Sequence, residues 1–210
     1  MRSGVTVSAL LIIFIVFSSS GYAQVTIEPK RAVPVLLLCG LAAANDQQIR
    51  DTVQSSRAPG GDAFYETVTI FGSGGGLAIV GSLAVLGEKE TAYKAANAII
   101  YAGITTQILK NIVGRPRPYT AETVNQPLSF SSDYASFPSG HTATAFALAQ
   151  VLATEYPQYK YLFYGGAILV GISRIYLDQH YTSDVIAGAA IGIYAGSHVP
   201  ANSYLYQWQF

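Results

Sequence analysis

The densest group of chemically active residues lies in the stretch ISRIYLDQHYTSDV, which runs from Ile172 to Val185. It contains Arg174, His180 and Asp184, in a chain of which only 11% of the residues are charged. His180 and Asp184 are four residues apart and would share one face of a helix that begins near His180. Asp184 could then accept a hydrogen bond from one imidazole nitrogen, which leaves the other nitrogen free to attack an electrophile. An arginine beside them could bind phosphate oxygens through two parallel hydrogen bonds.

Two further polar groups lie upstream of this stretch. The sequence KNIVGRPRP contains Lys110, Arg115 and Arg117, three cations that would repel one another without an anion between them. The sequence PSGH places Ser139 as a helix N-cap and His141 just after it, where the free N–H groups of the first helical turn can bind phosphate. The three groups together therefore predict an anion site next to a reactive imidazole.

Each group alone also has an ordinary structural interpretation. A His–Asp pair is often a structural hydrogen bond, and cations commonly flank a membrane segment. A metal site built from histidine and aspartate is another alternative, which neighbouring cations disfavour. Topology favours the phosphate interpretation, because helices that alternate in direction would bring all three groups to the same end of a bundle. That end would be the outer one, which a signal peptide would select.

The three groups also resemble the signature of the type 2 phosphatidic acid phosphatase family, which shares its site with vanadium haloperoxidases. That signature is Lys, six residues, Arg-Pro; then Pro-Ser-Gly-His; then Ser-Arg, five residues, His, three residues, Asp. Every position and every spacing is present between Lys110 and Asp184, a stretch of about a third of the chain. The flanking helices add only a general similarity.

The resemblance implies a phosphatase that needs neither a metal nor any other cofactor. His180 would attack phosphorus to form a phosphohistidine, and Asp184 would orient it. His141 would protonate the leaving group and then activate water. The phosphate oxygens would be held by Lys110, Arg117, Ser139, Gly140 and Arg174. Arg115 lies outside the signature, and a solvent-facing or lipid-facing position suits it as well as a substrate contact does.

Composition is consistent with a membrane-associated enzyme and argues against a partner that is a nucleic acid. Half of the 210 residues are hydrophobic, and 12 Lys and Arg balance 12 Asp and Glu, whereas nucleic-acid-binding proteins usually have a basic excess. Residues 1–23 predict a signal peptide, with an uncleaved N-terminal anchor as the alternative. The only cysteine is Cys39, so an internal disulfide is excluded.

Helices must position these groups, and the sequence predicts an all-α bundle of about five to six of them, embedded in a membrane, with the active site at the outer helix ends. Residues 24–66 form an N-terminal helix (Val33–Ala44) and a polar loop or interfacial helix, residues 67–200 the phosphatase core, and residues 201–210 an aromatic tail. The prolines of Gly114–Pro138 exclude a helix there. The core helices are predicted at Thr67–Gly87, Thr91–Val113, Thr142–Glu155, Lys160–Leu177 and Ser183–Val199.

Two features of these segments bear on packing. Thr67–Gly87 has 21 residues without a charge, which is long enough for a membrane span. Gly188, Gly192 and Gly196 are spaced by four, so they would lie on one helix face and let a neighbouring helix approach closely. The SGGG run that begins at Ser73 is likewise interpreted as close helix packing.

The sequence thus favours a phosphatase that acts on a phosphomonoester or pyrophosphate of a lipid, in a membrane, with its site facing the periplasm or the cell exterior. Its partners would be a phosphorylated lipid or another phosphoester. A soluble nonspecific periplasmic acid phosphatase is the main alternative. A vanadate-dependent haloperoxidase is disfavoured by the short chain, and a non-enzymatic membrane lipid-binding scaffold by the complete set of catalytic positions.

Overall fold

The computed structural model describes residues 29–120 and 122–199, and the predicted all-α fold is confirmed within them. The predicted signal peptide and aromatic tail lie outside the described residues. The helices are α2 (Pro29–Ser55), α3 (Gly61–Thr69), α4 (Gly74–Val85), α5 (Lys89–Val113), α6 (Gly140–Glu155), α7 (Lys160–Tyr176) and α8 (Thr182–Ser197). Short 3₁₀ turns lie at Ile70–Gly72 (η1), Pro118–Thr120 (η2), Ser132–Tyr134 (η3) and Pro157–Tyr159 (η4).

Helix α6 lies at the centre of the bundle, where it packs against α5, α7 and α8, most extensively against α8. Four of its nine buried residues are alanines, which lets the facing helices come close. Gly188 and Gly192 of α8 face it directly. A Cβ atom at Gly192 would overlap the backbone of α6 at Ala143, and one at Gly188 would overlap the carbonyl oxygen of Ser139. The predicted close approach at the α8 glycines is therefore confirmed.

The prediction of one continuous helix over Thr67–Gly87 is wrong. The chain bends by 50° between Gly61–Gly72 and Gly74–Val85. The bend lies where Gly72 packs against the backbone of His141, a contact that leaves no room for a Cβ atom. In the SGGG run, only Gly76 lies near α6, so its interpretation as close helix packing holds for that residue alone. Across the described chain, only this bent pair is long and apolar enough to cross a membrane, and each helix taken singly is not.

Helix α2 is longer than predicted, because it continues through the polar residues that follow Ala44 as far as Ser55. Two ion pairs hold this extension against the rest of the molecule. Asp46 pairs with Arg115, and Arg50 pairs with Asp178 in the turn before α8. Polar residues that suggested a loop are thus the ones that attach the helix.

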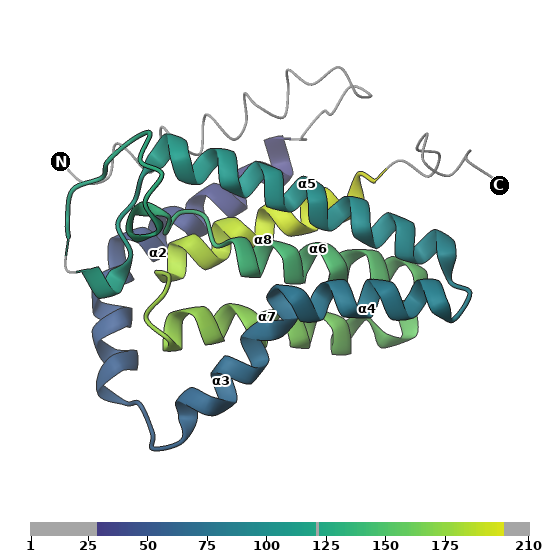
Figure 1. Ribbon diagram of the computed structural model, residues 1–210. Coiled ribbons are helices and arrows are strands. Elements are labelled where there is room, and N and C mark those ends of the chain that lie inside the picture. The colour runs from purple at the N-terminus through teal and green to yellow at the C-terminus, as the bar shows by residue number, and fades with distance from the viewer. Residues whose placement is uncertain (1–28, 121, 200–210) are drawn as a thin grey trace.

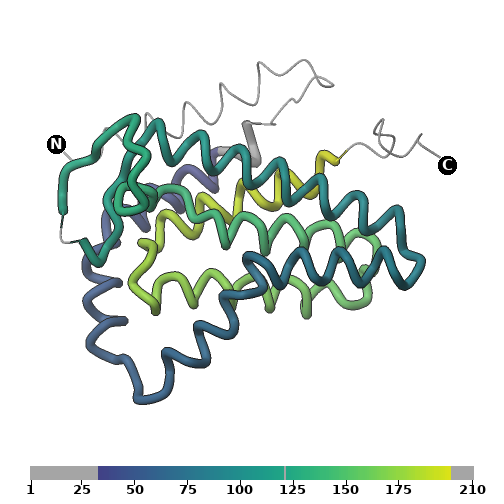
Figure 2. Tube along the Cα trace, in the orientation of Figure 1, coloured from purple at the N-terminus to yellow at the C-terminus, as the bar shows by residue number. Residues whose placement is uncertain are grey.

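Four helix ends meet at one end of the bundle, on the left in Figure 1: the last turns of α5 and α7 and the first turns of α6 and α8. The connection between α5 and α6 covers this end, and its course is clearest in the tube of Figure 2. Backbone hydrogen bonds fix the connection, since Gln126 N donates to Gly114 O at 2.8 Å and Leu128 N donates to Asn111 O at 2.6 Å. The predicted convergence of the three polar groups at one end is what this topology produces.

Candidate active site

His180 lies in the turn between α7 and α8, two residues before α8 begins, and only 3% of its surface is exposed. Its Nδ1 lies 2.7 Å from the backbone carbonyl oxygen of Ser136. A carbonyl can only accept, so Nδ1 carries the proton and Nε2 keeps a free lone pair. Burial lowers the pKa of His180 to about 3; the charges of Lys110 and Arg117 act in the same direction and Asp184 acts against them. The imidazole is therefore neutral and nucleophilic at physiological pH.

Asp184 lies in the first turn of α8 and is completely buried. Its carboxylate accepts hydrogen bonds from Tyr181 N at 2.8 Å, Ser136 Oγ at 2.6 Å and Arg115 Nη1 at 2.6 Å. The expected direct bond to His180 is absent, because the Nδ1–Oδ2 distance of 3.7 Å is too long. His180 precedes the helix instead of sharing its face, and Ser136 connects the two side chains by bonding to both.

Lys110 and Arg117 approach the same place from the end of α5 and the connection after it. Lys110 is 8% exposed, and its Nζ donates to the carbonyl oxygen of Ala135. Arg117 is held by Ser132 O at 2.9 Å and by Gln179 Oε1 at 2.7 Å. The charges of Lys110 and Arg117 act on both His141 and His180. Two cations are thus held close to two imidazoles.

Arg174 lies in the last turn of α7 and is 7% exposed. Its Nη1 donates to Thr69 Oγ1 of α3 at 2.9 Å. Its Nε is buried and has no hydrogen-bond acceptor among the described residues. A buried guanidinium N–H without an acceptor is costly, so it is available to an anionic ligand.

The N-terminus of α6 supplies the remaining predicted residues. Ser139 caps the helix by accepting from Thr142 N, and its own N–H donates to Asp184 O at 3.0 Å. A Cβ atom at Gly140 would lie 3.8 Å from Cε of Lys110, so the helix start adjoins this cation. The imidazole of the half-buried His141 makes no hydrogen bond to any described residue. Burial lowers the pKa of His141 to about 4, and the charges of Arg174, Lys110 and Arg117 act in the same direction.

All eight predicted site residues therefore lie at the same end of the bundle. Four further residues that the sequence analysis did not assign to the site surround Asp184: Asp46, Arg115, Ser136 and Ser183. The guanidinium of Arg115 points inward instead of towards solvent or lipid, because it bonds to Asp184, Asp46 and Ser183. The available signals were an acidic residue where the polar part of α2 begins, and an arginine set among prolines.

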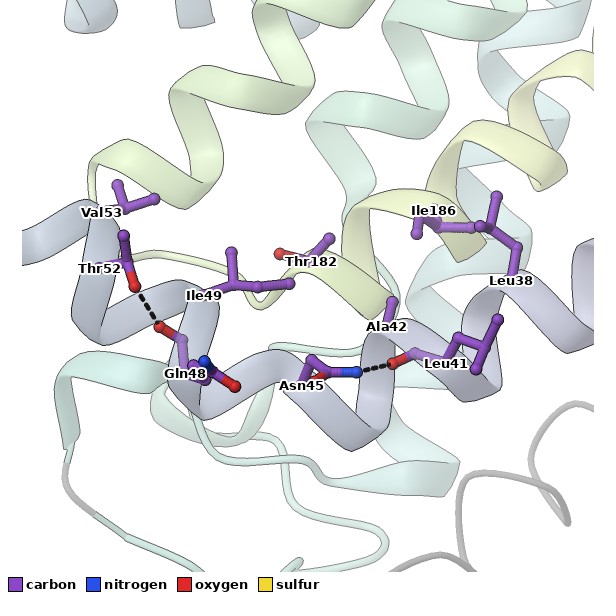
Figure 3. A pocket seen from close by; sticks show the side chains of 10 residues that line it. All are labelled: Leu38, Leu41, Ala42, Asn45, Gln48, Ile49, Thr52, Val53, Thr182 and Ile186. Carbon is purple, nitrogen blue, oxygen red and sulfur yellow. Dashed lines mark hydrogen bonds between the residues drawn. The ribbon is translucent and has the colours of Figure 1, made fainter.

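Two mostly apolar hollows of about 560 Å³ each lie beside this site. One separates α2 from α8, and Figure 3 shows Thr182 pointing into it from the start of α8, near Ile49 of α2. The other lies between α2, α3 and α7 and has Tyr65 and Tyr176 in its wall. Thr182 lines both, whereas none of the eight predicted site residues lines either. The hollows are therefore neighbours of the polar site and not part of it.

A metal site needs several acidic, thiol or imidazole side chains that point to one place. Within residues 29–120 and 122–199, no three His, Cys, Asp or Glu side chains are grouped so as to hold a metal ion. The donors that gather here are instead cations and N–H groups, which suit an oxyanion.

Comparison with known proteins gives a consistent result. A sequence profile described as the PAP2 superfamily matches residues 91–207, more than half of the chain. The Lipid A 1-phosphatase of Rhizobium johnstonii is 37% identical over 98 residues, which span 45% of this chain and 40% of that relative, so this chain matches less than two thirds of its length.

Two crystal structures are similar to the fold. Aquifex aeolicus LpxE superimposes with a TM-score of 0.63 at 31% identity, over 72% of this chain and 92% of that one. A transmembrane PAP2 type phosphatidylglycerolphosphate phosphatase from Bacillus subtilis gives 0.59 over 92% of this chain and 93% of that one. At 23% identity, the second likeness concerns the fold alone.

Proposed function

Since this chain belongs to the PAP2 superfamily, we propose that it is a phosphatase that hydrolyses a phosphomonoester or pyrophosphate of a lipid through a phosphohistidine intermediate. The observation that carries the proposal is the buried, neutral His180, whose Nε2 is unprotonated beside Lys110 and Arg117. A free imidazole nitrogen beside fixed cations suits attack on a bound phosphoryl group.

In the first step, Nε2 of His180 attacks phosphorus and the bond from phosphorus to the lipid oxygen breaks. His141 gives its proton to the departing oxygen. Burial and the neighbouring cations lower the pKa of His141 to about 4, and the negative charge of the bound phosphate opposes the effect of those cations and favours the protonated imidazole. Asp184 stabilises the positive charge that develops on the imidazole of His180, through Ser136 and through space at 3.7 Å. The products of this step are the free lipid alcohol, or a lipid phosphate from a pyrophosphate, and a phosphohistidine.

In the second step, neutral His141 takes a proton from water, and the water oxygen attacks phosphorus. The phosphorus–nitrogen bond of the phosphohistidine breaks, which releases inorganic phosphate and returns His141 to its protonated form. In both steps the non-bridging oxygens are held by Lys110, Arg117, Ser139, Gly140 and Arg174. The unpaired Nε of Arg174 and the open N-terminus of α6 support these assignments.

A lipid substrate is supported by the surface around the site. Large apolar side chains are exposed along the bundle, and a second group is exposed on the connection that covers the site, where Phe130 is 86% exposed. The 37% identity to a Lipid A 1-phosphatase also supports a lipid substrate. We propose a membrane location with the site at the outer surface, and lipid A carrying a 1-phosphate as the first substrate to test.

The test is phosphate release by detergent-purified protein from a panel of lipid A, phosphatidylglycerol phosphate, phosphatidate and a polyprenyl pyrophosphate, with EDTA present. His180→Ala should lower the rate by at least about a thousandfold, as loss of a nucleophile does elsewhere. His198→Ala is the matched control, because His198 lies at the far end of α8, and it should keep the wild-type rate. Equal release by the wild type and His180→Ala would contradict the nucleophile assignment.

A further inference from the structure

We propose that Asp46 and Arg115 are positioning residues that hold the carboxylate of Asp184 in place beside the nucleophile. This inference rests on the proposed function, since it concerns the chemistry of His180. Asp46 lies on α2, outside the stretch that the family profile matches, and Arg115 lies outside the signature spacing. The matched family features assign neither residue a role.

The geometry is a buried chain of contacts that runs from α2 to the nucleophile. Arg115 Nη2 donates to Asp46 Oδ2 at 3.0 Å, and Arg115 Nη1 donates to Asp184 Oδ1 at 2.6 Å. The other oxygen of Asp184 accepts from Ser136, whose carbonyl accepts from Nδ1 of His180. The guanidinium also stacks on the ring of Tyr181, 4.2 Å from its centroid. One arginine therefore fixes one carboxylate oxygen while the other remains directed towards the imidazole.

Because these contacts are buried, the loss of one of them destabilises the others. Asp46 is 4% exposed and Asp184 is 0% exposed, so neither carboxylate has water as an adequate alternative partner. Burial alone would lower the pKa of the Arg115 guanidinium, and the carboxylates of Asp184 and Asp46 raise it above its usual value. Removing one member of a buried ion pair leaves an uncompensated charge, so each member constrains the others.

The charges explain why a second carboxylate is needed. Arg115 with Asp184 alone would form a neutral pair, which would do little for a cation on His180. With Asp46 included, the group carries one net negative charge next to the imidazole that becomes positive in the reaction. Asp46 thus offsets the charge of Arg115 and leaves that of Asp184 available to the reaction.

Asp46 also fixes the start of the helix that carries Asp184. Its Oδ1 accepts from Ser183 N at 2.9 Å, and its Oδ2 accepts from Ser183 Oγ at 2.5 Å. Substitution of Asp46 should therefore disturb both the charge and the orientation of Asp184. The ion pair of Arg50 and Asp178 attaches α2 one turn away without touching Asp184, which makes it the natural control.

The experiment compares Asp46→Asn, Arg115→Lys and the control Arg50→Gln as full-length protein in detergent, with a lipid phosphate that the wild type hydrolyses. We expect Asp46→Asn and Arg115→Lys to lower kcat by about tenfold. Loss of the hydrogen-bond partner of a metal-ligating histidine costs about 10–100-fold in activity, and the smaller value is used here because Asp46 and Arg115 act on His180 through Asp184. KM and competitive inhibition by inorganic phosphate should stay within about twofold, because the phosphate-binding cations are untouched. Arg50→Gln should keep kcat while lowering Tm.

Unchanged kcat in Asp46→Asn, with an active wild type, would overturn the inference and leave the proposed function intact. A loss of kcat in Arg50→Gln equal to that in Asp46→Asn would also overturn it, because the effect would then be general loosening of α2. An inactive wild type would instead contradict the proposed function itself. Ser183→Ala is the milder variant in case Asp46→Asn fails to fold, since it keeps the backbone bond to Asp46; it should lower kcat by about threefold with unchanged phosphate inhibition.

Discussion

At the residue scale, the site depends on an imidazole held by a main-chain oxygen and on a buried carboxylate held by an arginine: His180 bonds to the carbonyl of Ser136, and Arg115 bonds to Asp184. The spacing of His180 and Asp184 suggested a shared helix face, whereas His180 lies before α8 and bonds to the carbonyl of Ser136. A main-chain acceptor has no sequence signature, so this contact was unpredictable. Arg115 was misjudged for a related reason, because its partner Asp46 is 69 residues away and no spacing rule connects them.

The position of the proton on His180 leads to a prediction about pH. Its pKa is lowered to about 3 from 6.5, so the neutral imidazole persists as the pH falls from 8 to 5. The imidazole ¹⁵N signals, assigned by their loss in His180→Ala, should therefore not titrate over that range. In Lys110→Met, which removes one of the cations that oppose protonation, the midpoint should move upward. A wild-type midpoint between pH 6 and 7 would show that burial does not dominate.

At the element scale, helix identity was predicted well where apolar runs ended in prolines or charges, as in α5, α6 and α7. The bend between α3 and α4 was missed because the whole segment is apolar, and a break in such a run depends on what it packs against. Here the partner is the backbone of His141, which Gly72 contacts. The same bent segment contains Thr69, whose hydroxyl accepts a hydrogen bond from Arg174. The segment therefore contacts two site residues, His141 through Gly72 and Arg174 through Thr69.

The contact of α8 with α6 can be tested through its glycines. In Gly192→Ala the new Cβ atom would overlap the backbone of α6, and overpacking of this kind costs about 1–3 kcal/mol of unfolding free energy. Gly166→Ala on α7 is the matched control, because a Cβ atom there has nothing within 4 Å. It should stabilise the helix by up to about 1 kcal/mol. Thermal unfolding in detergent checks both, and equal Tm values would contradict the proposed close packing.

At the scale of the whole molecule, the exposed apolar surface is the main argument for a membrane location. Exposed large side chains lie along α2, α5 and α7, among them Leu37 at 63%, Ile104 at 55% and Ile168 at 51%. The site lies at one end of this surface, and Lys94 pairs with Glu90 and Glu155 near the other. Apolar sides between polar ends suit a bundle that sits in a bilayer.

We therefore expect the protein to remain in the membrane fraction after a wash with alkaline carbonate and to leave it only with detergent. Replacement of Leu37, Ile104 and Ile168 by glutamine should increase the released fraction, because each substitution places a polar group on the apolar surface. The control replaces the same three residues by other apolar ones (Leu37→Ile, Ile104→Leu and Ile168→Leu), which keeps the surface apolar and should leave the released fraction unchanged. Complete release of the wild-type protein by carbonate would favour the soluble periplasmic alternative.

The hydrogen bond from His180 to the carbonyl of Ser136 has a consequence for how the enzyme can change. A main-chain oxygen is present whatever residue occupies the position, so no single replacement at Ser136 deletes the acceptor. The tautomer of His180 therefore depends on the backbone conformation at position 136 and not on which residue occupies it. Substitutions there should leave the tautomer unchanged as long as the connection between α5 and α6 keeps its conformation.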